Sequence, residues 1–143
     1  MATLKISELS VGDWVEINHE VYGWNPAQIN VCGDLGIGAY FKDIDPEEEY
    51  DCCLSEARPI PITAEILEKN GLIRHERDAD NPKRVVLSNH FIMAITYTDA
   101  DWWRFLIYDE ELSSKELFNG IIYSVHQLQH ALRLAGVDKE INL

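Results

Sequence analysis

Hydrophobic and polar positions alternate along the first part of the chain with the period of two that half-buried strands show. The alternation is clearest in residues 12–18 and 28–31, and the glycines of residues 36–41 indicate a strand with a bulge or bend. Residues 50–58 fit one more strand. Short strands between frequent turns predict a small barrel or curled sheet, and an SH3-like barrel is the smallest architecture that fits about 55 residues. The turn-forming pieces are residues 22–26, 32–34 and 45–49.

The pattern changes at Pro59 and Pro61, which fix their own φ angles and keep the residues before them out of the helical conformation. We expect an extended connector there. Thr63 follows as a helix N-cap, and Gly71 ends the helix in the left-handed conformation, with Leu72 folding back on the last turn. The sequence therefore predicts a stiff connector followed by a short helix.

The chain then returns to strand-like patterns. Residues 84–87 and 91–97 predict two strands joined by a hairpin turn at 88–90. Residues 103–108 and 117–123 predict two more. The run 91–97 is apolar at both alternating sets of positions, which predicts burial on both faces of its strand. The intervening loops fall at residues 78–82 and 98–101.

The last part of the chain has helical periodicity. Ser124 and Gln127 have the spacing of a capping box, with Ser124 as the N-cap and Gln127 reaching back. The helix is expected to end near Ala135, with Gly136 closing it and Val137 as the apolar residue beyond. Its core stripe, which we expect to pack on the second sheet, is Val125, Leu128, Leu132 and Ala135.

Together these patterns predict an α+β protein. Residues 1–58 form an SH3-like small β-barrel. Residues 59–143 form an α+β unit, a β-sheet with a short helix before it and a C-terminal helix packed on it. We expect the two units to pack together as one compact protein, because neither has a generous core alone.

The charge balance is the most informative feature of the composition. The 143 residues carry a formal net charge of −13, and residues 1–58 hold twelve acidic and three basic side chains, a net of −9. Such a surface repels phosphate backbones, which disfavours direct nucleic-acid binding. The excess can serve solubility, a basic partner, or mimicry of a nucleic acid. No apolar run reaches the roughly 20 residues of a membrane helix, and no secretory signal is seen, so no membrane association is expected.

The cysteines indicate a reducing compartment. They are three in number, Cys32, Cys52 and Cys53, and the last two are adjacent. Vicinal cysteines rarely pair with each other, and the Cys-x-x-Cys spacing of zinc knuckles is absent from the sequence. This usage predicts a cytoplasmic protein.

One pair of residues has metal-ligand spacing. His126 and His130 lie four apart on the last predicted helix, where two imidazoles can share one metal. The intervening residues lack the glutamate of His-Glu-x-x-His, and no third ligand is evident nearby. A partly exposed pair with a structural or partner-contacting role is therefore favoured, and metal binding through the pair is the alternative.

Other motifs that could carry chemistry fit poorly. The glycines of residues 33–38 are in the wrong order for a dinucleotide fingerprint and precede a strand. Residues 78–81 resemble the start of a calcium loop, but Lys83 and Asn89 stand where glycine and glutamate are required. A cysteine paired with a histidine in space could act as a nucleophile, but no motif indicates it. We therefore predict no enzymatic activity and no bound cofactor.

Aromatic residues suggest recognition instead. Tyr22 and Trp24 fall in a predicted loop containing glycine and proline, where they either fold down over the barrel or form a partner-binding patch. Trp102 and Trp103 are adjacent on a predicted strand, so they point to opposite faces and one is expected in the core.

The leading hypothesis is a protein-binding accessory module with an unidentified partner and an open oligomeric state. The alternative is an acidic nucleic-acid mimic that blocks a DNA-binding enzyme through its N-terminal unit of net charge −9, so that neutralising residues 47–49 should weaken its binding. The possible partner-binding residues are Tyr22, Trp24, Trp102, His126 and His130.

Three segments carry a resemblance that spans nearly the whole chain. Residues 59–71, Pro-Ile-Pro-Ile-Thr-Ala-Glu-Ile-Leu-Glu-Lys-Asn-Gly, resemble a Pro-Ile-Pro-Leu-Thr segment in a group of small proteins from gut bacteria, their phages and mobile elements. Residues 12–15 resemble the group's opening Gly-Asn-Trp-Val, and residues 125–129 its closing Val-His-Gln-Leu-Gln. Leu72 replaces the group's usual phenylalanine. The group has no established activity, so the resemblance implies only a cytoplasmic accessory protein encoded near phage or mobile-element genes.

Overall fold

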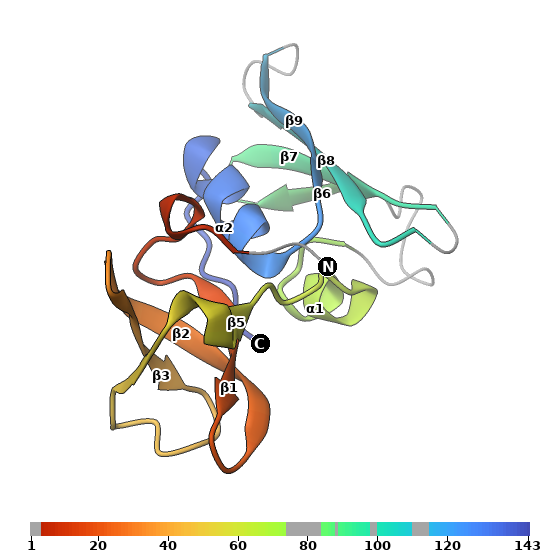
Figure 1. Ribbon diagram of the computed structural model, residues 1–143. Coiled ribbons are helices and arrows are strands. Elements are labelled where there is room, and N and C mark those ends of the chain that lie inside the picture. The colour runs from red at the N-terminus through yellow and green to blue at the C-terminus, as the bar shows by residue number, and fades with distance from the viewer. Residues whose placement is uncertain (1–3, 74–83, 88, 98–99, 110–114) are drawn as a thin grey trace. The chain divides into compact units, whose positions relative to one another are not determined.

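The computed structural model describes residues 4–73, 84–87, 89–97, 100–109 and 115–143. The chain divides into two compact units, residues 1–60 and 61–143, which are described separately (Figure 1). The fold is α+β, and both sheets are antiparallel. Within the described residues, none of the helices has the length and apolar character needed to cross a membrane. The expected interface between the units stays a prediction.

The N-terminal unit is a five-stranded sheet that curls into a half-barrel (Figure 1). The strands lie in the order β4-β3-β2-β1-β5, and short 3₁₀ turns occur at Ile6–Glu8 and Leu54–Glu56. β2 is the longest strand and has a bulge between Ile29 and Val31, which allows it to bend. The strand bounds are β1 (Trp14–His19), β2 (Gly23–Gly33), β3 (Gly36–Phe41), β4 (Tyr50–Cys52) and β5 (Ala57–Arg58).

The alternation read from the sequence sets the core of this unit. Val15 and Ile17 of β1 point inward and are completely buried, whereas Glu16 between them faces outward. The core is aliphatic apart from Phe41, and it also receives residues that precede β1. Its members are Leu4, Leu9, Val15, Ile17, Ala27, Ile29, Ile37, Ala39, Phe41 and Ala57.

Two predictions for this unit are wrong in detail. Residues 22–26 are not a loop, because β2 already begins at Gly23 and the β1–β2 turn is confined to residues 20–22. Pro26 is tolerated in β2 because it lies where the ladder with β3 ends, and its carbonyl still accepts a hydrogen bond from the Lys42 N–H. Residues 50–58 are not one strand either, since the 3₁₀ turn separates β4 from β5.

The C-terminal unit opens with the predicted short helix, α1 (Ala64–Lys69). The Thr63 hydroxyl accepts the Ile66 N–H at 3.2 Å, so the predicted N-cap is confirmed. Gly71 adopts φ +70°, and the Leu72 N–H bonds back to the Leu67 carbonyl, which confirms the helix end.

A contact distant in sequence fixes the end of α1. The Asn70 side chain is buried and donates to the Asn142 carbonyl at 2.8 Å. Asn142 in turn donates its N–H to the Asn70 side-chain oxygen at 2.7 Å. Two reciprocal hydrogen bonds therefore tie the last described residues to α1.

The second sheet is a four-stranded meander in the order β6-β7-β8-β9 (Figure 1). Its strands are β6 (Arg84–Leu87), β7 (His90–Ile95), β8 (Trp103–Asp109) and β9 (Glu116–Ile122). Ile92 and Ala94 of β7 are buried, but the alternating Phe91, Met93 and Ile95 are only half-buried. The prediction of burial on both faces of β7 is therefore wrong. The predicted loop at residues 78–82 lies outside the described residues.

The C-terminal helix, α2 (Val125–Leu134), contacts β9. Its predicted core stripe is buried at all four positions, Val125, Leu128, Leu132 and Ala135. The helix ends as expected, because Gly136 has φ +76° and the Val137 N–H bonds to the Leu132 carbonyl at 2.8 Å.

The capping box of α2 differs from the prediction. Ser124 occupies the N-cap position, but its hydroxyl makes no capping hydrogen bond and lies 3.1 Å from Nδ1 of His126. Gln127 does reach back, but its Oε1 accepts the N–H of Tyr123, one residue before the cap. The Ser124 hydroxyl therefore pairs with the buried imidazole of His126 and not with a backbone N–H of the first helical turn.

Candidate functional site

Four aromatic rings gather at one end of the N-terminal sheet, and we call them the aromatic cluster: His19, Tyr22, Phe41 and Tyr50. The His19 ring centroid lies 5.0 Å from those of Tyr22 and Tyr50 and 5.3 Å from that of Phe41. Phe41 ends β3 and Tyr50 begins β4. The cluster therefore joins the β1–β2 turn to both ends of the β3–β4 loop.

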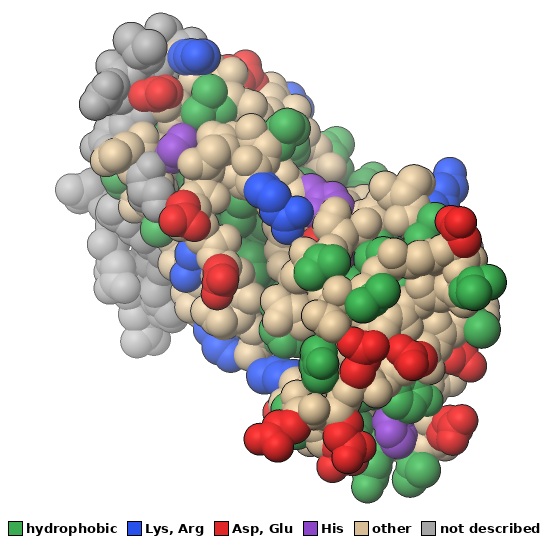
Figure 2. Space-filling view, turned by 90° about the vertical axis from the view of Figure 1, so that its left-hand side faces the viewer, with side chains coloured by type: hydrophobic (Ala, Val, Ile, Leu, Met, Phe, Trp, Pro, Cys, Tyr) green, Lys and Arg blue, Asp and Glu red, His purple; other side chains and the backbone are tan. Residues whose placement is uncertain are grey.

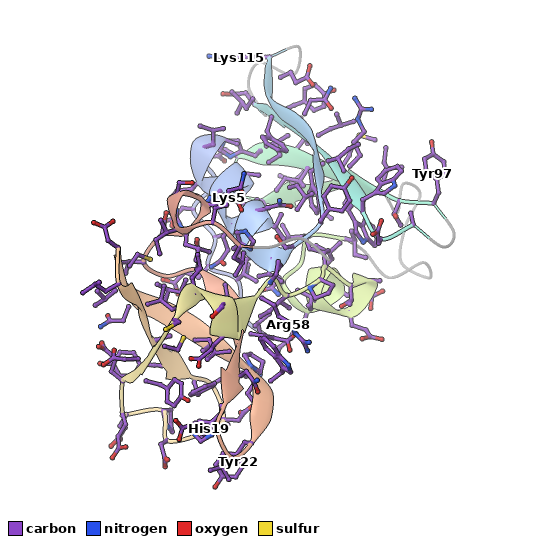
Figure 3. All side chains as sticks on the ribbon, in the orientation of Figure 1. Lys5, His19, Tyr22, Arg58, Tyr97 and Lys115 are labelled. Carbon is purple, nitrogen blue, oxygen red and sulfur yellow. The ribbon has the colours of Figure 1, made fainter. Side chains whose placement is uncertain are left out.

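His19 also holds the β1–β2 turn in shape. Its Nδ1 accepts hydrogen bonds from the backbone N–H groups of Val21 at 3.0 Å and Tyr22 at 3.3 Å. Asn25 also contributes to the turn by donating from its side-chain amide to the Tyr22 carbonyl at 3.1 Å. The side chains of this fixed turn project outward, so Val21 is 75% exposed and Tyr22 is 64% exposed. In Figure 3, His19 and Tyr22 lie together at the end of the hairpin.

An acidic loop begins and ends beside this turn. Residues 42–49 connect Phe41 to Tyr50, both of which contact His19. Lys42 is the loop's single basic residue, against five exposed carboxylates. Figure 2 shows acidic side chains over the N-terminal unit, in the lower part of the view, with apolar side chains among them. The carboxylates of the loop belong to Asp43, Asp45, Glu47, Glu48 and Glu49.

Trp24 behaves differently from Tyr22. The Arg58 guanidinium lies 4.1 Å from the centre of its indole ring, and the same guanidinium forms an ion pair with Glu16 at 3.0 Å. These contacts hold the tryptophan against the strands, and it is 37% exposed. The two loop aromatics of the sequence are thus separated: Tyr22 projects at the turn, and Trp24 is engaged on β2.

The other candidate residues belong to the C-terminal unit. Trp102 is half-buried, and its ring centroid lies 5.7 Å from that of Tyr97 in an edge-to-face arrangement. Trp103 is half-buried as well. The prediction that one of the two tryptophans is a core residue is therefore wrong. His126 is 2% exposed, so the expectation of a partly exposed pair fails for it. His130 remains half-buried, with the two imidazole centroids 6.1 Å apart.

Metal binding and thiol reactivity are the two chemistries that the histidines and cysteines of the sequence could support. Among the residues that the structure describes, no group of three or more His, Cys, Asp or Glu side chains is placed to hold a metal ion. Burial, followed by the nearby charge of Glu56, raises the pKa of Cys52 to about 11. Its thiol is therefore protonated near neutral pH and is a weak nucleophile. The calcium-like residues 78–81 lie outside the described residues.

Of the aromatic cluster and the turn, the sequence pointed to Tyr22 alone, and it did not point to Val21, His19, Phe41 or Tyr50. Val21 stands next to Tyr22 and is more exposed, but a lone valine beside a turn carries no sequence signal. His19 was not singled out because its role depends on a fold that brings Phe41 and Tyr50 to it. Its position one residue before a three-residue turn is the only local indication of a capping role.

Comparison with known proteins gives no relative to which a function could be traced: no family model, no curated protein and no solved structure matches the chain.

Proposed function

We propose that the protein is a non-enzymatic binding module whose β1–β2 turn contacts a basic segment of a partner protein. The observation that carries the proposal is the exposure of Val21 and Tyr22 on a turn that His19 holds rigid. Neither side chain belongs to the core of its unit. Exposed apolar groups at a fixed, projecting position are typical of recognition surfaces.

The surroundings of the turn favour a basic partner. The five carboxylates of the loop at residues 42–49 produce a negative potential, which speeds the approach of a positively charged surface. Burial of an apolar side chain at an interface contributes on the order of 1.5–3 kcal/mol, so Val21 and Tyr22 can supply contact energy that charge alone does not. Because the turn is already ordered, little conformational entropy is lost on binding.

We also infer that the N-terminal unit is an SH3-like barrel. The inference is supported by the strand order β4-β3-β2-β1-β5, by the curl of the sheet, and by the 3₁₀ turn between β4 and β5. Membership of the group of small phage-related and mobile-element proteins, and a cytoplasmic location, are proposals of the same kind that rest on the sequence.

The exposed carboxylates of residues 47–49 favour a second candidate function, mimicry of a nucleic acid. A mimic binds through charge, so its affinity falls steeply between low and physiological salt. A contact made by Val21 and Tyr22 holds in the same range. Salt dependence therefore separates the two functions.

The test uses capture of partners from the native host by three purified variants. Val21→Ser with Tyr22→Ser is expected to lose a captured protein that carries a basic segment. Val11→Ser with Tyr97→Ser is the matched control, because these residues are 62% and 68% exposed, and it should keep that protein. With the purified partner, the turn variant should raise the dissociation constant at least tenfold. The third variant changes Glu47, Glu48 and Glu49 to Gln. If this variant loses the captured protein and the other two keep it, the mimic hypothesis replaces the proposal.

A further inference from the structure

A groove of about 490 Å³ lies where the β2–β3 hairpin meets β4. Val31, Gly38 and Asp51 are cross-strand neighbours there, and the exposure of Val31 and Asp51 places the groove on the outer face of the sheet. Glycines at positions 36 and 38 leave its floor without side chains. Val31 and Leu35 supply apolar surface. We call this feature the hairpin groove.

Two carboxylates converge over the floor of the hairpin groove. A methyl group added at Gly38 would lie 2.8 Å from Oε1 of Glu49 and 3.0 Å from Oδ1 of Asp51. Both oxygens are thus within hydrogen-bond distance of a single point. Every point on a circle around the line that joins the two oxygens has these same distances to Oε1 of Glu49 and Oδ1 of Asp51. An ammonium or guanidinium nitrogen on the open side of that circle can be bound by both carboxylates at once.

The position of Glu49 is fixed by a further contact. Its second oxygen, Oε2, accepts a hydrogen bond from the Asn30 side-chain amide at 2.6 Å. Asn30 is the bulge residue of β2, between Ile29 and Val31. The bulge therefore aims one oxygen of Glu49 into the groove.

We propose that the hairpin groove binds a lysine or arginine side chain of the partner. The alkyl part of that side chain lies on Val31 and Leu35, and its charged end lies between Glu49 and Asp51. The described residues that line the groove include no lysine or arginine, so no internal cation competes for this place. A divalent metal fits less well, because calcium needs six to eight oxygen ligands and the described residues form no metal-binding group here. The identity of the partner as a basic protein rests on the proposed function, but the groove can be tested without the partner.

The probes are Nα-acetyl-lysine amide and Nα-acetyl-arginine amide, titrated into the ¹⁵N-labelled full chain and followed by ¹H–¹⁵N correlation spectra. We expect saturable shifts concentrated on the amides of Gly36, Gly38 and Asp51. Nα-acetyl-norleucine amide has a similar stem without the charge and should bind at least tenfold more weakly. Non-saturating shifts spread over the acidic residues of the chain would overturn the proposal. So would equal binding of the norleucine probe, or tighter binding of calcium chloride at the same amides.

Variants test the geometry. Asp51→Asn and Glu49→Gln should each weaken binding of both probes by about threefold to tenfold, because one of two charge-assisted hydrogen bonds is lost. Glu8→Gln removes an exposed glutamate of the same unit and should leave binding unchanged. Gly38→Ala should weaken binding by displacing both carboxylates. The backbone at Gly38 is not in the left-handed region, and the displaced atoms are side-chain ends, so we expect this variant to fold. Unchanged binding in Asp51→Asn and Glu49→Gln would contradict the proposal.

The two proposals fail separately. The Val21→Ser, Tyr22→Ser variant should bind the lysine probe like the natural chain, because neither residue lines the hairpin groove. If the probe does not bind but this variant loses its partner, the groove proposal is wrong and the proposed function stands. If the probe binds and this variant keeps every partner, the groove proposal stands and the proposed function is wrong.

Discussion

The two sheets solve the same burial problem in different ways. The N-terminal sheet curls, so its inner face encloses a core and its outer face carries polar residues such as Glu16, Gln28 and Asn30. The C-terminal sheet is an open meander, and its second face carries half-buried apolar residues, among them Met93 and Leu106. In the curled sheet only one face is buried, so the alternation of polar and apolar residues predicts that face correctly. In β7 the residues are apolar on both faces, so the sequence does not show which face is buried.

The largest expected effect separates the two cores. Phe105 is completely buried in β8, and Phe105→Ala should lower the free energy of unfolding of the C-terminal unit by about 3–5 kcal/mol. Native-state hydrogen exchange should then speed up at Ile92 and Ala94 by about a hundredfold or more. The amide of Ile17 in the other unit should be unaffected. Leu106→Ala, at the next and half-buried position, is the control and should have a smaller effect. Equal acceleration in both units would show that they unfold together.

A middle-sized effect compares two side chains that each accept backbone hydrogen bonds. Thr63→Ala should cost about 1 kcal/mol of stability, because the first turn of α1 loses its cap. His19→Phe keeps a ring for Tyr50 to contact but removes the acceptor for Val21 and Tyr22, and should cost about 0.5–1.5 kcal/mol. Urea unfolding at pH 7 measures both. An unchanged free energy of unfolding in His19→Phe would mean that ring contacts alone hold the turn.

The smallest predicted effect is on the reactivity of a thiol. It concerns the N-terminal unit alone, because all three cysteines lie there. Burial raises the pKa of Cys52 from 9.0 to about 11, so the thiolate is disfavoured in the folded chain. At pH 8, Cys52 should react with iodoacetamide at least about tenfold more slowly than an ordinary cysteine, because its lower thiolate fraction outweighs the higher nucleophilicity of its thiolate. The rate should rise as the pH approaches 11, and urea should remove the difference. Peptide mapping by mass spectrometry gives the rate for each cysteine. Fast labelling of Cys52 at pH 8 without urea would contradict this prediction.

Much of the fold was predictable because local chemistry decides it. Thr63 and Gly71 set the ends of α1, and the stripe on α2 follows from helical spacing. Trp24 was misplaced because the turn signals of Gly23 and Pro26 outweighed the strand pattern, and only the end of the β2–β3 ladder explains why a proline fits there.

The candidate sites were harder to predict because they depend on register. Gly38 and Asp51 face each other only through the pairing of β3 with β4, and Asn30 reaches Glu49 only because of a bulge. Similarly, the Ser124 hydroxyl could bond either to the backbone or to His126, and the sequence does not decide between them. Partners that are distant along the chain leave no local signal.

The hydrogen bonds between Asn70 and Asn142 have a consequence for the order in which the chain is synthesised. These residues are 72 positions apart, so the end of α1 must wait for its partner until residue 142 has left the ribosome. All strands of the curled sheet lie within the first 60 residues and can pair long before that. A nascent chain therefore passes through a stage in which the strands of the N-terminal unit are paired and the side-chain amide of Asn70 still lacks Asn142 as its partner.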